Sequence, residues 1–375
     1  MRIQNILHIS YFSPTYPGNF IASLARLTEA TQKEYAVYFL FPIQARGAEW
    51  LSMLPVAQDR IFFCDFSPKG LYNYCKTLAA TLGAHKTVAH THFIDFLHLY
   101  AIKRSFKNNV CHYHMAAPEA NTWKRKIRRA LCRMIYAKSV IIGVSEPVAK
   151  GVHAYLPNAP CECITNAIDF EQLDTYSMGA PHKVGDTSDA FNLLIFGSDF
   201  HRKGVDLAIQ AVELLNTSHR KHCSLTILAH PIQVAQEHVK RYSTEGKSIT
   251  VVDTVRNIKD FFDGADAFLS PSRSEAFAYA VAEAAYCQCQ VIASDVPGQN
   301  TLMDIPMVLW VTPNDVQSLA DAICATIDRK NNGELERINA LQKEYVRAHY
   351  GIELWVKKNI DIYKKYFDAK KETPT

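Results

Sequence analysis

Two glutamates stand eight residues apart, where a predicted strand gives way to a predicted helix. The apolar segment Ala267–Leu269 stops at a Ser-Pro-Ser loop, and an alanine-rich stretch of helical character begins at Glu275. Glu283 lies about two helical turns further on, so both carboxylates can face one ligand. Carboxylates suit sugar hydroxyls. The same spacing allows a simpler interpretation, in which Glu275 caps the helix and Glu283 points into water.

The surroundings of this pair predict a strand–helix–strand unit. A second strand is predicted over residues 290–295, and it stops at a Pro-Gly turn. In such units the carboxyl ends of the strands face a ligand crevice. The backbone N–H groups of Ala276, Phe277 and Ala278 would be the unpaired donors of the first helical turn, which suits phosphate or polarised hydroxyls.

The run from Ala265 through Ser-Pro-Ser-Arg-Ser-Glu275-Ala-Phe to Glu283 resembles the E-x7-E signature of retaining GT-B glycosyltransferases of the family 4 type. The resemblance is strongest over residues 197–298. It implies that Glu275 meets the hydroxyls of the donor sugar and that Glu283 meets the ribose of the nucleotide. Position 276 usually carries glycine in that family and is alanine here, a departure that bears on which sugar is transferred.

A second cluster of charge follows the predicted strand 191–196. Arg202 and Lys203 stand where a loop opens a helix, a place that suits a diphosphate, although such a basic pair also occurs as an ordinary solvated turn. The segment resembles the family's Gly-Arg-x-x-x-x-Lys-Gly motif, with Lys203 aligned and Ser198 in place of the first arginine. The resemblance assigns Lys203 to the pyrophosphate, with Arg202 supplying charge from a neighbouring position. Such cations can replace a metal ion, and we expect no metal cofactor.

Histidines recur on two successive predicted strands, at His90, His92, His112 and His114. Strand alternation places His112 and His114 on one face. A pair at this spacing could ligate a metal, but the sequence indicates no third ligand, and histidines of a core or cleft are the commoner outcome. The resembled family has a histidine at the end of this strand that reaches toward the donor sugar, which implies that role for His114, with His112 as the alternative.

Three further positions follow from the resemblance or from their place in the chain. Gly18 is equivalent to the family's glycine-rich loop, which lets the backbone approach the donor phosphate, although a lone glycine after proline is also an ordinary turn. Ile258 lies where a family loop often touches the base. Asp95 follows a predicted strand, and this position is the only reason to expect that it meets the acceptor.

Stepwise alternation of strands and helices is predicted in both halves of the chain, which indicates mostly parallel sheets with helices on both faces. A helix is predicted over residues 20–33. The predicted strands cover residues 3–9, 35–41, 60–66, 87–93, 109–115, 139–145 and 161–168, and then 191–196, 224–229, 249–255, 267–269, 290–295 and 307–311.

The length of 375 residues suits two domains rather than one. We predict two doubly wound, Rossmann-like domains facing a central cleft in which ligands bind. The resemblance implies that they form a GT-B arrangement, with residues 1–175 as the acceptor-side domain, 176–190 as a polar linker, 191–350 as the nucleotide-sugar domain, and 351–375 as a helix that crosses back to the first domain.

Composition excludes several classes of protein. Ten cysteines without a signal-peptide-like start indicate free thiols in a reducing compartment, and we expect a cytoplasmic protein. No apolar run has the length needed to span a bilayer. The net charge of +4 is mild and gives no reason to expect nucleic acid as a partner.

The stretch from Trp123 to Lys138 predicts a basic amphipathic helix. Lys124, Arg125, Arg128 and Arg129 lie off an apolar stripe, so this helix could lie on an anionic bilayer, at about 1 kcal/mol per cation. The alternative is a domain helix whose apolar stripe packs on the sheet. We expect the first arrangement to hold the enzyme at the inner membrane face, near a glycan or lipid-linked acceptor.

Together these observations predict a retaining glycosyltransferase that uses a nucleotide-diphosphate sugar as donor and an acceptor hydroxyl, in bacterial surface polysaccharide or glycolipid assembly. Two alternatives share the architecture: a nucleotide-sugar epimerase, and a non-catalytic nucleotide-sugar-binding subunit. A dehydrogenase fits less well, because no predicted strand leads into a G-x-G-x-x-G turn. The donor base, the sugar and the acceptor have no signature in the sequence.

Overall fold

The computed structural model describes residues 2–13, 18–114, 123–175, 190–218, 222–243, 248–254 and 257–368, with the backbone alone for residues 123–126. The chain forms two compact units. The first contains residues 1–167 and 352–375, and the second contains residues 168–351. Of the linker expected at 176–190, residues 176–189 lie outside the described part of the chain.

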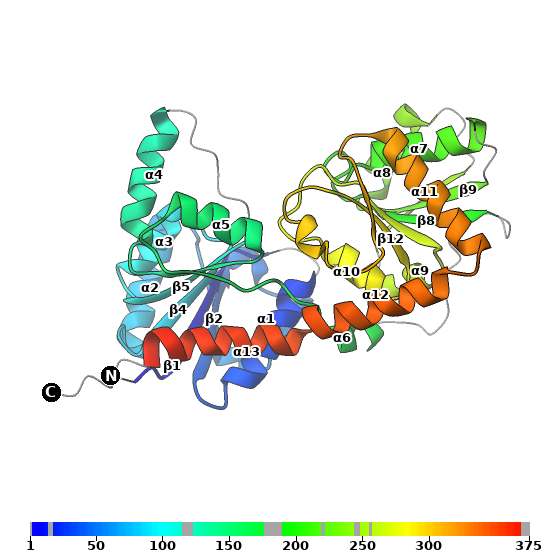
Figure 1. The fold of residues 1–375 in the computed structure, drawn as a ribbon. Helices are drawn as coiled ribbons and strands as arrows, with labels where there is room; N and C mark the ends of the chain where they lie inside the picture. Colours follow the sequence, from blue (N-terminus) through cyan, green and yellow to red (C-terminus); the bar gives the residue numbers. More distant parts are fainter. Residues whose placement is uncertain are drawn as a thin grey trace. The chain divides into compact units, whose positions relative to one another are not determined.

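The first unit is built on a seven-stranded parallel sheet with the order β3-β2-β1-β4-β5-β6-β7 (Figure 1). Continuous apolar runs form its central strands, because a parallel sheet is covered on both faces. Its strands are β1 (Asn5–Ser10), β2 (Ala36–Pro42), β3 (Ile61–Cys64), β4 (Thr87–His92), β5 (Asn108–Tyr113), β6 (Val140–Gly143) and β7 (Cys161–Cys163).

Alternate residues of β1 divide the core of this unit into two layers. Ile6 packs into a cluster with side chains of α1 and α13, and Leu7 packs into one with side chains of α2 and α3. Thus the two faces of the sheet are covered by different helices. The helices of this unit are α1 (Gly18–Thr31), α2 (Pro68–Leu82), α3 (Phe96–Lys103), α4 (Trp123–Tyr136), α5 (Glu146–Tyr155) and α13 (Ile352–Tyr363).

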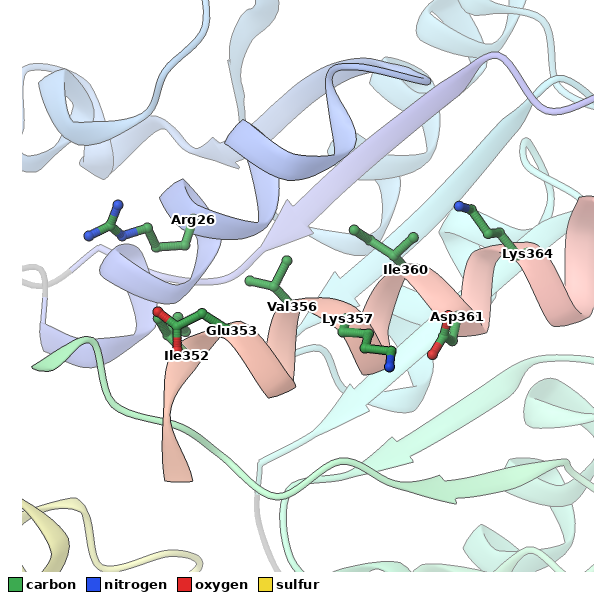
Figure 2. Close-up of a pocket in the computed structure, with 8 residues that line it drawn as sticks. All are labelled: Arg26, Ile352, Glu353, Val356, Lys357, Ile360, Asp361 and Lys364. Carbon is green, nitrogen blue, oxygen red and sulfur yellow. The ribbon is translucent and has the colours of Figure 1, made fainter. Parts of the chain in front are cut away.

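The last helix, α13, completes the first unit although it follows the whole of the second along the chain. Trp355, Ile362 and Tyr363 are buried in the same cluster as Ile6. The helix runs beside α1, and a groove lined by charged and apolar side chains of both helices follows the contact (Figures 1 and 2). The core of the first unit therefore draws on both ends of the chain.

The second unit has a six-stranded parallel sheet with the order β10-β9-β8-β11-β12-β13. Leu193 and Leu194 of its first strand point to opposite faces and enter separate apolar clusters. Its strands are β8 (Phe191–Phe196), β9 (Cys223–Leu228), β10 (Ile249–Val252), β11 (Ala267–Ser270), β12 (Gln290–Ser294) and β13 (Leu309–Val311). Its helices are α6 (Phe170–Thr175), α7 (Val205–Ser218), α8 (Ile232–Tyr242), α9 (Ile258–Asp263), α10 (Tyr279–Tyr286), α11 (Val316–Asn331) and α12 (Leu335–Tyr350).

The prediction of two doubly wound parallel sheets is confirmed, and both sheets reverse their strand order at one point, between β1 and β4 and between β8 and β11. Such switch points are where open α/β sheets bind ligands. The chain enters the second unit at Ile168 and leaves it at Gly351, and these two residues form an isolated parallel bridge.

Several predicted boundaries were wrong, among them the following three. The strand expected at 161–168 ends at Cys163. The helix expected to start near Phe20 starts at Gly18, whose φ of +54° only glycine adopts easily. The helix expected from Glu275 starts at Tyr279, so Ala276, Phe277 and Ala278 lie in the loop before it. Within the described residues no helix is both long and apolar enough to cross a membrane.

Candidate active site

The two charged motifs of the second unit meet at the switch point of its sheet. Lys203 is in the loop that follows β8, and Glu275 is in the loop that follows β11, the neighbouring strand. Because the strands are parallel, both loops leave the same edge of the sheet. The fold thus joins two segments that are 72 residues apart in the sequence.

Glu275 is held between two cations. Its Oε1 atom lies 2.7 Å from Nζ of Lys203, and its Oε2 atom lies 3.1 Å from Nη1 of Arg202. Ser272 donates a further hydrogen bond of 3.1 Å to Oε1. The carboxylate side chain is 8% exposed, whereas Lys203 and Arg202 keep 25% and 39% of theirs exposed. The cations therefore remain open to a ligand while Glu275 fixes their positions.

Arg202 is bound on its other side by Asp199, with 2.7 Å between Nε and Oδ2. Burial opposes the charge of Arg202, but Asp199 and Glu275 outweigh burial and raise the pKa of the guanidinium. The hydrogen bond from Arg202 lowers the pKa of Asp199. Ser198, the position aligned with the family's first arginine, is exposed and gives this cluster no charge. The structure thus places Arg202, not residue 198, beside Lys203.

Two glycines let the loops approach one another this closely. Gly204 has a φ of +70°, and a Cβ atom on it would lie 2.1 Å from the carbonyl oxygen of Pro271. Gly298 has a φ of +85°, and a Cβ atom on it would lie 2.1 Å from the carbonyl oxygen of Glu275. Both positions exclude a side chain, so three loops pack backbone to backbone around Glu275.

A second ion pair, which the sequence analysis missed, lies next to the first. Arg273 binds Asp206 through two parallel contacts of 2.8 and 2.7 Å, a geometry that fixes both side chains. The backbone N–H of Arg273 also donates to the carbonyl of Arg202 over 2.8 Å. Nothing in the local sequence marks Arg273 or Asp206, because their partnership depends on the neighbouring positions of β8 and β11.

The other predicted residues of this unit lie around the same edge of the sheet. Glu283 is in α10 and is 6% exposed, so it is not the solvated side chain of the simpler interpretation. The backbone N–H groups of Ala276, Phe277 and Ala278 donate no hydrogen bond within the described part of the chain, although they precede the helix instead of forming its first turn. Ile258 is the first residue of α9.

The first unit has a cavity of about 410 Å³ at the carboxyl ends of β4 and β5. Its lining includes four of the predicted residues among aromatic side chains, namely Asp95, His112, His114 and Arg128. Asp95 caps α3 by accepting hydrogen bonds from the backbone N–H groups of Leu97 and His98. Gly18 belongs to this unit too, at the start of α1.

The histidines of the first unit form a larger cluster than the sequence indicated. His8 of β1, His90 and His92 of β4 and His112 of β5 lie on one face of the sheet, and His114, which follows β5, stacks on His112. Burial lowers the pKa of His8 and of His112 to about 3. Burial and the neighbouring rings hold the pKa values of the other three well below the usual value. All five imidazoles are therefore neutral at pH 7.

The basic helix α4 packs through Cys132 and Tyr136, and its apolar stripe does not face the sheet. Ile127, Leu131 and Met134 are 53%, 46% and 76% exposed. Arg129 donates to the carbonyl groups of Ala154 and Tyr155 at the end of α5. Arg128 is exposed, with its guanidinium over the ring of Phe96.

The side chains of Lys124 and Arg125 lie outside the described residues. Arg129 thus has a structural contact that accounts for its charge, and the exposed apolar stripe is the feature of α4 that needs a partner.

Comparisons with known proteins agree with this architecture. Residues 190–329 match the family model described as "Glycosyl transferases group 1". No curated protein matches the chain.

Among solved structures, a glycosyltransferase from Rickettsia africae has 14% identity and a TM-score of 0.76, with 99% of this chain and 100% of that chain covered. The HepE protein of Anabaena in complex with UDP-glucose has 16% identity and a TM-score of 0.70, with 96% and 99% covered. A sucrose-phosphate synthase from Thermosynechococcus elongatus has 17% identity and a TM-score of 0.72, with 98% and 100% covered. The fold is that of GT-B glycosyltransferases.

Proposed function

We propose that this protein is a retaining glycosyltransferase that transfers a sugar from a nucleotide-diphosphate donor to an acceptor hydroxyl, in the assembly of a bacterial surface polysaccharide or glycolipid. The observation that carries the proposal is the contact of Lys203 and Arg202 with the buried carboxylate of Glu275, at the switch point of the second sheet. The family match over residues 190–329 supports the same function.

This cluster contains the groups that are needed when the diphosphate leaves the donor sugar. As the bond between the sugar and the diphosphate breaks, negative charge grows on the leaving oxygen, and fixed cations beside it lower the barrier. Lys203 and Arg202 supply the positive charges, and the N–H groups of residues 276–278, which donate no hydrogen bond to any described residue, supply further donors. Glu275 would bind the sugar hydroxyls and Glu283 the ribose. His114 of the first unit would meet the sugar, and the incoming hydroxyl would attack from the face that the diphosphate leaves.

Donor binding can be tested by thermal shift and calorimetry with UDP, GDP, ADP and their sugar conjugates, beginning with UDP-glucose because the Anabaena structure holds it. Lys203→Met removes a charge-assisted contact, so we expect the Kd of the bound nucleotide to rise about 10- to 100-fold. Glu283→Ala should weaken the binding of the nucleotide as well.

Lys330→Met is the matched control. It removes the cation paired with Asp266 at 2.6 Å, just before β11 and thus at the opposite edge of the sheet. Equal effects of the two lysine variants on the Kd, or no stabilisation of the protein by any nucleotide, would refute the proposed donor site.

Products separate the proposal from its two alternatives. A transferase releases nucleoside diphosphate in proportion to glycosylated acceptor, and proton NMR of the new linkage reports whether the anomeric configuration is kept. An epimerase changes the sugar without an acceptor, and a binding subunit binds the donor without turnover.

We also propose that α4 lies on an anionic membrane surface. The exposed stripe of Ile127, Leu131 and Met134 favours this over the domain-helix alternative, whose stripe would pack on the sheet. Leu131→Gln with Met134→Gln should reduce sedimentation with anionic liposomes severalfold, and Arg128→Gln should reduce it less.

Lys357→Gln, on α13, is the control, and uncharged liposomes test the electrostatic part. Unchanged sedimentation of the Leu131 and Met134 variant would refute membrane contact through this face.

A further inference from the structure

We propose that His92, His112 and His114 form a three-nitrogen site for a transition-metal ion such as Zn²⁺, beside the cavity in the first unit. One ring nitrogen from each of these side chains can be chosen so that all three lie within 4.8 Å of one another. The inference goes beyond the proposed transfer reaction, which needs no metal.

The available nitrogens point to a missing partner. Within the described part of the chain, Nδ1 of His92, Nε2 of His112 and Nε2 of His114 are buried and make no hydrogen bond. Buried polar atoms in proteins nearly always have a partner, and three such atoms on neighbouring rings need an explanation. A metal ion accepts a lone pair from each, and the neutral form of imidazole is the form that ligates.

The other nitrogens of two of these rings are already held. Nε2 of His92 lies 3.3 Å from Nδ1 of His8, and Nδ1 of His112 lies 3.3 Å from Nε2 of His90. His90 in turn contacts the hydroxyl of Tyr363 over 2.6 Å. Metal-binding histidines characteristically hydrogen-bond through the second ring nitrogen, which fixes the tautomer and the orientation of the ring. This pattern leaves free the nitrogens of His92 and His112 that would bind the ion.

A cavity borders two of the three rings. His112 and His114 line the cavity of about 410 Å³. The triad carries no negative charge, so a dication there would take water, hydroxide or another anion from the cavity as its fourth ligand, as in open three-histidine zinc sites. Zinc–nitrogen bonds of about 2.0–2.1 Å require ligand nitrogens about 3.4 Å apart, so nitrogens that lie within 4.8 Å of one another must approach by up to about 1.4 Å on binding. Three imidazoles without thiolate or carboxylate suit Zn²⁺, Co²⁺ or Cu²⁺.

A metal would use the Nε2 atom of His114, so a metal ion and a donor sugar would compete for it. The test therefore reads metal binding directly. Protein without an added histidine tag is stripped with a chelator and titrated with Co²⁺. We expect one ion per chain, with the visible absorption of four-coordinate cobalt and without the near-ultraviolet bands that cysteine thiolates produce. Zn²⁺ should displace the cobalt.

His114→Gln is the main variant, because His114 follows β5 and does not lie within the sheet. We expect it to weaken Co²⁺ binding by more than the about 10- to 100-fold that loss of an outer contact causes. His112→Gln should do the same. His85→Gln, which removes an exposed histidine of this unit, should change nothing. Wild-type protein without a cobalt spectrum, thiolate bands, or equal affinity in His114→Gln and His85→Gln would each overturn the proposal.

Discussion

Mild acid should unfold the first unit before the second, because of the buried histidines of its sheet. His8, His90 and His92 are 0% exposed and His112 is 4% exposed. In an unfolded chain each would have a pKa of about 6.5. In the folded unit burial lowers the pKa of His8 and His112 to about 3 and holds those of His90 and His92 well below the usual value.

The sign follows from which state binds protons. Between pH 6.5 and about 3 these histidines bind protons in the unfolded chain but not in the folded unit. The free energy of unfolding of the first unit is therefore at its full value above pH 6.5 and falls as the pH drops below it. One pH unit below 6.5, each histidine costs about 1.4 kcal/mol, and the four together cost about 6 kcal/mol. Since a domain has about 5–15 kcal/mol in total, the first unit should be close to unfolding near pH 5.5.

Urea unfolding at pH 7.5, 6.5 and 5.5, followed by tryptophan fluorescence in the presence of a chelator, measures this effect. The Trp310→Phe background leaves Trp50, Trp123 and Trp355, all of which belong to the first unit. His8→Gln should reduce the loss between pH 7.5 and 5.5 by about 1.4 kcal/mol, and the exposed His85→Gln should leave it unchanged. A total loss below about 2 kcal/mol, or equal slopes in the two variants, would refute the assignment of neutral buried imidazoles.

Two further predictions concern the packing around Glu275. Gly298→Ala adds a Cβ atom 2.1 Å from the carbonyl oxygen of Glu275, so we expect it to lower the free energy of unfolding by about 2–5 kcal/mol and to weaken nucleotide binding. The control is Gly333→Ala, at a position with a φ of +72° and no neighbour within 4 Å. It should lower the free energy of unfolding only by the about 1–2 kcal/mol of backbone strain. Comparable urea midpoints for these two variants would contradict the close contact. Arg273→Met leaves the carboxylate of Asp206, 8% exposed, without its bidentate partner, and should destabilise the second unit by about 2–4 kcal/mol in urea; a loss below about 0.5 kcal/mol would show that the pair contributes little.

Much of the fold could be predicted from sequence, because buried parallel strands are continuous apolar runs. The strand Phe191–Phe196 was placed with its observed bounds. The start of α10 was misplaced because Glu275 fits a helix N-terminus by residue type. In the structure its side chain is occupied by Lys203 and Arg202, and the loop runs on to Ala278.

Candidate site residues could be predicted where they belong to one local sequence motif. Contacts between residues that are far apart in the sequence could not. Lys203 and Glu275 were each identified from local pattern. The contact between them, the Arg273–Asp206 pair and the inclusion of His8 in the histidine cluster all depend on which strands are neighbours. Strand order is set by long-range packing, so no local pattern could reveal these contacts. The roles assigned to Lys203, Arg202, Glu275, His114, Glu283, Ile258 and Gly18 all stay predictions.

The path of the chain through the two units has a consequence for synthesis on the ribosome. The points where the chain enters and leaves the second unit lie side by side. Ile168 pairs with Gly351, and the N–H of Ile168 donates to the carbonyl of Tyr350 over 2.9 Å. The second unit can therefore fold as soon as residue 351 has emerged. The first unit, although its strands are translated first, lacks Trp355, Ile362 and Tyr363 of its core until residues 352–363 have also been translated. Until then α1 covers only part of this face of the sheet, and the exposed apolar remainder makes the nascent chain a natural client for chaperones.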